Sequence, residues 1–101
     1  MRKLVQFDFK FNGPFGEDMT KALEGLARSI NDEPGFVWKI WTENPQTGEA
    51  GGIYVFADEA AARDYIEKHT ERLKAFGITT VNVKIFNINE GLTRLTKGPN
   101  V

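Results

Sequence analysis

Within residues 4–12, apolar and polar side chains alternate, and this pattern constrains the fold more than any other feature of the chain. A period of two places every second side chain on the same face of an extended segment. The pattern therefore predicts a strand with one polar face and one apolar face that needs a covering layer. The apolar face would consist of Val5, Phe7, Phe9 and Phe11.

The rest of the chain switches between the helical and the strand period. An apolar stripe with helical spacing predicts a helix over residues 17–31. A second stripe predicts a helix that begins after Asp58, a favourable N-cap residue, and continues to Leu73. The tail from Glu90 onward is polar and weakly patterned. Strand-forming composition predicts further strands over residues 36–43, 52–56 and 78–88.

This order of elements, β-α-β-β-α-β, defines the expected fold class. It predicts an α+β protein of the ferredoxin-like type, with a four-stranded antiparallel sheet and both helices on one face. A chain of 101 residues is too short for two cores, so we expect one domain over residues 1–101.

The second face of the predicted sheet is also apolar. Trp38 and Trp41 are three residues apart, so on a regular strand they would point to opposite faces. The strands over residues 52–56 and 78–88 likewise carry large apolar groups on both sides. One layer of helices covers only one face. We therefore expect the other face to pack against a second copy, sheet on sheet, as a homodimer.

Composition excludes several kinds of partner. Lysine and arginine number 13 and aspartate and glutamate 14, which gives a net charge of −1. Such a balance provides no general attraction to phosphate backbones or anionic lipid. No apolar run approaches the roughly 20 residues that span a membrane. We therefore expect neither a nucleic-acid nor a membrane partner.

Cysteine is absent, which excludes disulfides, thiol redox chemistry and cysteine-bound zinc. The first residues lack the apolar core of a signal peptide and run directly into the strand pattern. Both features favour the reducing cytoplasm as the location of this protein.

The sequence offers few signatures of metal or cofactor chemistry. The single histidine, His69, has no metal-ligating residue one helical turn away. The single serine, Ser29, lies in no nucleophile elbow, and no glycine-rich nucleotide motif is present. The segment 52–56 has the aromatic residues of an RNA-recognition strand, but the basic residue before it is missing. We expect no metal and no cofactor.

Several aromatic side chains with a polar tip remain as candidates for a site. His69 and Tyr65 lie one helical turn apart on a core-facing stripe, where a neutral imidazole could exchange a proton. The residues alone favour the structural interpretation, because a half-buried histidine under a helix and aromatic residues of a core give the same pattern. The other candidates are Trp38, Trp41 and Tyr54.

Five ordered blocks of sequence carry a resemblance to a known family. They are Phe11–Gly16, Ser29–Phe36 without Asp32, Trp38–Glu43 without Ile40, Glu49–Tyr54 and Glu67–Thr70. Together they make the chain, from about residue 4 to residue 92, similar to the YdhR-like family of mono-oxygenases. The resemblance implies a dimeric α+β barrel. It also implies kinship with small oxygenases that oxidise phenol-like aromatic compounds with O2, using neither metal nor flavin.

A related branch of that superfamily degrades haem with an asparagine on its first strand, a tryptophan and a histidine on its second helix. This chain has Asn12 and His69 at comparable places. Its third strand carries Tyr54 and Phe56 in place of a tryptophan, so haem degradation is a minor alternative.

We therefore expect a cofactor-independent mono-oxygenase that acts on a small, flat aromatic or quinol-like substrate. His69 would accept the phenolic proton, aided by Tyr65 or Asn12. The ring would lie between Trp38 and Tyr54, in a pocket completed by Trp41, Phe36 and Phe9. Two alternatives remain: a non-catalytic homodimer that binds an apolar aromatic metabolite, and an interaction module whose aromatic residues serve only the core and the dimer.

Overall fold

The computed structural model describes residues 1–99, so residues 100 and 101 of the domain expected over 1–101 lie outside the described part. The expected order of elements is confirmed, with one helix added at the end. The elements are β1 (Lys3–Lys10), α1 (Gly16–Ile30), β2 (Phe36–Asn44), β3 (Glu49–Phe56), α2 (Glu59–Ala75), β4 (Asn82–Asn87) and α3 (Glu90–Leu95).

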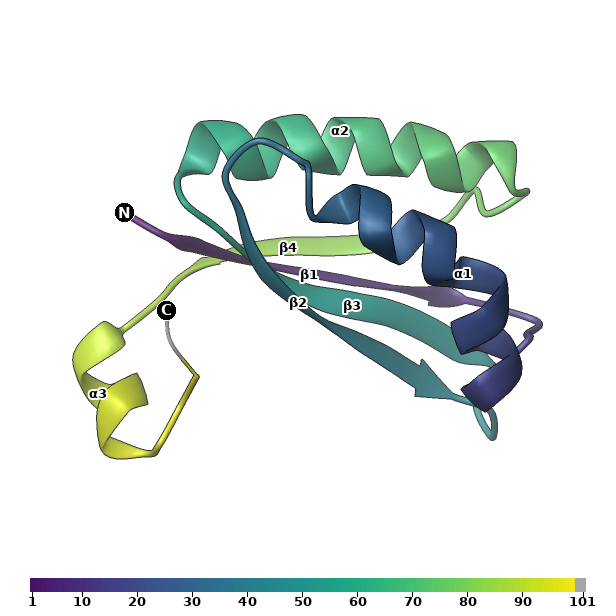
Figure 1. Ribbon diagram of the computed structural model, residues 1–101, viewed down its shortest axis with the longest axis horizontal. Coiled ribbons are helices and arrows are strands. Elements are labelled where there is room, and N and C mark those ends of the chain that lie inside the picture. The colour runs from purple at the N-terminus through teal and green to yellow at the C-terminus, as the bar shows by residue number, and fades with distance from the viewer. Residues whose placement is uncertain (100–101) are drawn as a thin grey trace.

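The four strands form one antiparallel sheet in the order β2-β3-β1-β4. The helices α1 and α2 lie on the same side of this sheet, while α3 projects from the opposite side near the end of β4 (Figure 1). The predicted ferredoxin-like α+β arrangement is therefore confirmed. None of the helices within residues 1–99 is long and apolar enough to cross a membrane.

Several boundaries of the predicted strands are corrected: the strand expected over residues 52–56 begins at Glu49, and the one expected over 36–43 ends at Asn44. The first strand ends at Lys10 and not at residue 12, although the Phe11 amide still donates to the Gly48 carbonyl at 2.8 Å. The last begins at Asn82, and residues 78–81 lie outside it. There the Ile78 amide donates to the Leu73 carbonyl at 2.9 Å, which closes the end of α2. Ile78 and Val81 pack against the core from this loop, so their apolar character reflects burial and not strand pairing.

The helix α3 was not predicted. It begins at Asn89, whose side chain accepts from the Leu92 amide at 3.0 Å, an ordinary N-cap. None of its six residues is buried, and Leu92 and Leu95 are 62% and 79% exposed. Because α3 packs no side chain into the core, its sequence lacks the long apolar stripe of α1 and α2. The helix could therefore not be predicted from hydrophobic periodicity.

The core lies between the sheet and the two long helices. Residues directly opposite on neighbouring strands share a face, so the pairs Val5–Tyr54 and Phe7–Val83 place these four residues on the helix side. The fully or nearly buried members of the core are Val5, Phe7, Ile30, Tyr54, Phe56, Ala62, Tyr65 and Leu73.

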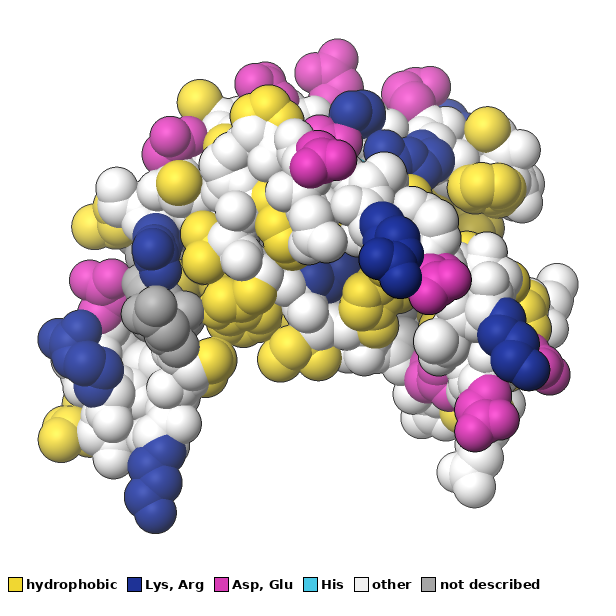
Figure 2. Space-filling view, viewed as in Figure 1, with side chains coloured by type: hydrophobic (Ala, Val, Ile, Leu, Met, Phe, Trp, Pro, Cys, Tyr) yellow, Lys and Arg dark blue, Asp and Glu magenta, His cyan; other side chains and the backbone are white. Residues whose placement is uncertain are grey.

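The opposite side of the sheet carries a second apolar surface, which we call the outer face. Register places six apolar residues on it: Leu4, Trp38, Ile40, Ile53, Val55 and Phe86. Ile40 and Phe86, on the two edge strands, are 51% and 45% exposed. Hydrophobic side chains gather on this underside of the sheet, between α3 and the far ends of β2 and β3 (Figure 2).

A bulge in β2 sets which aromatic residues face the helices. Phe36 pairs with Phe56 on the helix side, but the register shifts before Trp38, which pairs with Val55 on the outer face. After the bulge the strand is regular, so Trp41, opposite Gly52, faces the helices. The two tryptophans therefore point to opposite faces, as expected.

Candidate active site

The space between the sheet and the helices contains a cavity of about 800 Å³. Its walls come from β1, β2 and β3, from Met19, Leu23 and Leu26 on α1, and from His69 and Leu73 on α2. The loop over residues 76–80 closes one end. A cavity of this size, lined mainly by apolar groups with a few polar tips, is typical of small-molecule sites.

Five of the residues singled out from the sequence line this cavity. They are Phe9, Asn12, Trp41, Tyr54 and His69. Asn12 is exposed on the turn after β1, whereas Tyr54 and His69 are buried, with only 1% and 4% exposure. The structure therefore brings one imidazole and one phenol together deep in an aromatic hollow.

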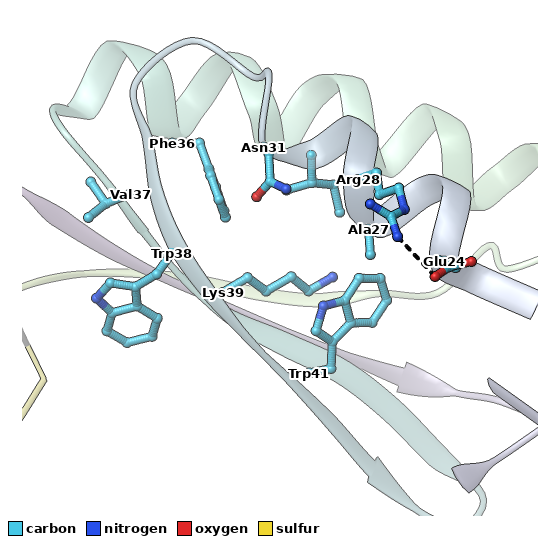
Figure 3. Close-up of a pocket in the computed structure, with 10 residues that line it drawn as sticks. Glu24, Ala27, Arg28, Asn31, Phe36, Val37, Trp38, Lys39 and Trp41 are labelled. Carbon is cyan, nitrogen blue, oxygen red and sulfur yellow. Dashed lines mark hydrogen bonds and ion pairs between the residues drawn. The ribbon is translucent and has the colours of Figure 1, made fainter. Parts of the chain in front are cut away.

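The other three candidates lie elsewhere. Tyr65 is buried in the core behind Tyr54 and does not line the cavity. Phe36 and Trp38 line a separate hollow of about 460 Å³ at the edge of the sheet, between β2 and α1 (Figure 3). Lys39 and Trp41 line both hollows.

His69 is held by Arg72, one turn further along α2. Arg72 Nη1 donates to His69 Nδ1 at 3.3 Å. Because an arginine side chain can only donate, Nδ1 must be the acceptor, and the proton of the neutral ring lies on Nε2. Burial, with added repulsion from Lys39 and Arg72, lowers the pKa of His69 to about 3, so the ring is neutral at pH 7.

The Nε2–H group of His69 remains available to a ligand. Arg72 is the hydrogen-bond partner that residues 1–99 provide for the ring. No fully buried polar side-chain atom in this part of the chain lacks a partner, so Nε2 is accessible. Since His69 lines the cavity, its Nε2–H can donate to a molecule bound there.

A carboxylate on the loop before β2 anchors Arg72. Glu33 Oε1 lies 2.6 Å from Lys68 Nζ and 3.7 Å from Arg72 Nη2. The Glu33 side chain is only 10% exposed, so this ion-pair cluster is partly shielded from water. It joins the start of β2 to α2 and keeps the guanidinium beside the imidazole.

The two tyrosines form a hydrogen-bonded pair. Their hydroxyl groups lie 3.2 Å apart, and the Tyr65 ring stacks on His69 with centroids 5.1 Å apart and planes 18° from parallel. Burial raises the pKa of both phenols, so neither ionises near neutral pH. Tyr65 therefore orients Tyr54 and His69, while Tyr54 presents its ring to the cavity.

Lys39 is a cavity residue that the sequence analysis missed. Its Nζ lies 3.2 Å from the centroid of the Trp41 ring and 4.5 Å from that of Tyr54. Burial, and secondarily repulsion from Arg72, lowers the pKa of Lys39 to about 7. One signal was present in the sequence: Lys39 and Trp41 are two apart on a strand, so they share a face.

The arrangement favours acid–base chemistry on an organic ligand. Within residues 1–99 no group of three histidine, aspartate or glutamate side chains is placed to hold a metal ion. The cavity instead combines the Lys39 amine, whose pKa is lowered to about 7, with the N–H donor of His69 and flat aromatic walls. Lys39 lies in the cavity wall and repulsion between it, Arg72 and His69 disfavours extra positive charge there, so an anion bound beside Lys39 would be stabilised.

Fold and cavity together define a class: a small ferredoxin-like α+β protein with a large aromatic cavity between sheet and helices. The family model described as "Putative mono-oxygenase ydhR" matches residues 4–99. The chain belongs to this mono-oxygenase family. Among curated proteins, none matches the chain.

Three solved structures share the fold. SnoaB, a cofactor-independent oxygenase from Streptomyces nogalater solved as a variant, has a TM-score of 0.61 at 19% identity, covering 87% of this chain and 93% of its own. The structural-genomics protein YJCS has a TM-score of 0.64 at 17% identity, covering 88% and 100%. The protein NE2512 of unknown function from Nitrosomonas europaea has a TM-score of 0.59 at 20% identity, covering 88% and 91%.

Proposed function

We propose that this protein is a cofactor-independent mono-oxygenase that oxidises a small, flat aromatic or quinol-like compound with O2. The observation that carries the proposal is the cavity of about 800 Å³, in which Trp41, Tyr54, His69 and Lys39 surround one space. Membership in the family and the fold shared with SnoaB support the reaction class.

The protein has one chemical task in this reaction. An acidic phenol or quinol must lose a proton, because its electron-rich anion reacts with O2 far more readily than the neutral compound. One oxygen atom then enters the substrate and the other leaves as water. A group that accepts the proton in place contributes roughly 10²–10⁴-fold to such a rate.

Trp41 and Tyr54 would form the flat walls of the substrate site, and Phe9 also lines it. His69 takes a different role from the base expected from the sequence. Because Arg72 occupies Nδ1, we propose that the Nε2–H group donates to the oxygen of the substrate and stabilises its negative charge. We propose that Asn12, exposed at the turn and lining the same cavity, also contacts the substrate.

We also propose that the protein acts as a homodimer, with a second copy covering the outer face. Ile40 and Phe86 remain half exposed in the single chain, and α3, whose Leu92 and Leu95 are also exposed, lies on the same side of the sheet. Large apolar side chains left exposed on one side of a sheet are typical of an interaction site. The edge strands β2 and β4 bring these residues onto one surface, so sheet-on-sheet packing would bury them together.

Oxygen uptake by the purified protein tests the function. The protein, with no metal or flavin added, is offered anthrones, hydroquinones and naphthols, and consumption of O2 is compared with the spontaneous rate. We expect uptake with at least one compound, accompanied by a product that has gained one oxygen atom. Saturable binding without uptake throughout the panel would instead favour the alternative of a non-catalytic aromatic-binding protein.

A further inference from the structure

The side chain of Lys39 has an unusual position for a lysine on an edge strand. It does not extend into water but runs along the helix side of the sheet toward Trp41, beneath Ala27 and Arg28 of α1 (Figure 3). Its Nζ lies over the Trp41 ring and within 4.5 Å of the Tyr54 centroid. Two aromatic faces thus replace much of the water around the amine.

A glycine on the neighbouring strand makes this position possible. Gly52 lies directly opposite Trp41, and a Cβ atom there would come within 2.5 Å of Lys39 Cε and 3.2 Å of Tyr54 Cε1. Any larger residue would push the amine out of the aromatic cage. The lysine stem therefore crosses β3 only because position 52 has no side chain.

Resting on the function proposed above, we propose that Lys39 is the group that takes the hydroxyl proton of the substrate and then pairs with the resulting anion. The Nζ lone pair accepts the proton, the O–H bond breaks and an N–H bond forms. The products are an ammonium and a phenolate or enolate in contact. No oxidant or reductant takes part in this step.

His69 and Tyr54, the buried titratable groups beside Lys39, are less suited to accept the proton. The imidazole of His69 is neutral but has Nδ1 occupied by Arg72, and its pKa of about 3 makes it a weak base. Tyr54 stays a neutral phenol. An amine with a pKa of about 7 is half unprotonated at neutral pH, which is the optimum for a general base.

Several charged and titratable groups surround Lys39: Asp8, Lys10 and Glu49 line the same cavity, and Glu33 pairs with Arg72 at 3.7 Å. Arg72 and His69 face Lys39 from α2, Tyr54 from β3, and Arg28 and Glu24 line the adjoining hollow from α1, paired with each other at 3.2 Å. Arg72 disfavours the ammonium and His69 adds no charge at neutral pH. The cavity therefore releases the lysine proton readily until an anion is bound beside it.

Binding of para-nitrophenol, whose phenolate is yellow, tests the proposal directly. Below the pKa of the free dye, we expect added protein to increase the phenolate absorbance to saturation. Lys39→Met should abolish this increase, whereas Lys39→Arg should retain it because the charge remains. The exposed Lys21→Met on α1 is the matched control. Dye that is bound by equilibrium dialysis yet stays colourless would overturn the proposal.

A second measurement needs no ligand. With Trp38→Phe as background, the fluorescence of Trp41 reports the protonation of the amine above its ring. We expect a titration with a midpoint near pH 7, and a flat profile in Lys39→Met and Lys39→Arg. A flat profile without these substitutions would also overturn the proposal.

Oxygen uptake then separates this inference from the proposed function. With an active substrate, Lys39→Met and Lys39→Arg should both lower kcat/KM by about 10²-fold or more, because neither supplies an amine that accepts a proton. Phenolate binding and titration without any oxygenation would refute the oxygenase and leave the role of Lys39 in binding. Oxygenation that persists in Lys39→Met would refute the role of Lys39 and leave the oxygenase.

Discussion

Arg72 Nη1 lies 3.3 Å from Nδ1 of His69, and this contact assigns the ring proton to Nε2. The one histidine in the chain is thereby a hydrogen-bond donor toward the cavity. The relationship depends on a carboxylate far away in sequence, because Glu33 pairs with Arg72 at 3.7 Å.

The tautomer of His69 can be measured directly. With a single histidine in the chain, nitrogen NMR of the ring needs no assignment. We expect the signals of a neutral Nε2–H ring from pH 5 to pH 8, since the pKa is lowered to about 3. Arg72→Met should let the two tautomers mix, while Arg63→Met, which removes only a surface pair with Glu59, should not. An Nδ1–H ring in the unsubstituted protein would contradict the assignment.

The same histidine should shape stability in acid. Unfolded His69 takes up a proton as the pH falls below about 6.5, but the folded protein resists it until about pH 3. Between these values the unfolded state binds more protons, so stability decreases as the pH falls. In urea denaturation, we expect the unfolding free energy of His69→Gln to decrease less between pH 6.5 and pH 4 than that of the unsubstituted protein. Equal losses would show that His69 is accessible to protons in the folded state.

Gly52→Ala should disturb the amine without unfolding the protein. The new methyl group would meet Lys39 Cε at 2.5 Å, and the flexible lysine stem can move away from it. We expect the pH titration of Trp41 fluorescence to disappear and dye binding to weaken by about tenfold or more. Gly25→Ala is the control, because an added Cβ there meets nothing within 4 Å in α1. That change should stabilise the helix by about 0.5–1 kcal/mol.

The tyrosine pair predicts a coupling energy. Tyr65→Phe leaves the buried hydroxyl of Tyr54 without its partner at 3.2 Å, which should cost about 1–3 kcal/mol of unfolding free energy. The double variant Tyr54→Phe/Tyr65→Phe leaves no unpaired hydroxyl, so its cost should be smaller than the sum of the two single changes. A double-mutant cycle by urea denaturation measures this difference. Additive costs would mean that the hydroxyls do not interact.

The outer face predicts self-association. We expect the protein to sediment as a dimer at micromolar concentration and Ile40→Asp to sediment as a monomer, because the charge replaces an exposed apolar side chain of the outer face. Ala60→Asp places the same charge on the exposed side of α2 and should leave the dimer intact. A monomeric unsubstituted protein would refute the proposed assembly.

Several parts of the fold follow from local pattern. The alternation in β1, the helical stripe of α1 and the Asp58 cap of α2 are properties of neighbouring residues, and each is confirmed. The short α3 and the loop over residues 78–81 were missed for a physical reason. The apolar residues Ile78 and Val81 pack on the core from a loop, whereas α3 has no buried residue. Neither segment therefore shows the regular apolar period from which elements are predicted.

The candidate site was predictable only in part. Tyr54 and His69 lie on core-facing positions of regular elements, so periodicity brings both to the space between sheet and helix. The placement of Phe36 could not be predicted in this way. On a regular strand Phe36 and Trp38 would share a face, but the bulge between them puts them on opposite faces. A single inserted residue reverses the face of everything on one side of it, and pattern alone does not locate such a bulge.

By itself, the sequence determined the order of the elements and the presence of large apolar and aromatic residues on both faces of the sheet. These properties depend on spacing along the chain. Which face meets the helices was decided by the tertiary structure. Only the tertiary structure decided that Lys39 lies in a cage of Trp41 and Tyr54, and that Arg72 selects the tautomer of His69. Both depend on contacts between residues that become neighbours only when the chain folds. The position of Lys39, for example, requires that Gly52 on the adjacent strand has no Cβ atom.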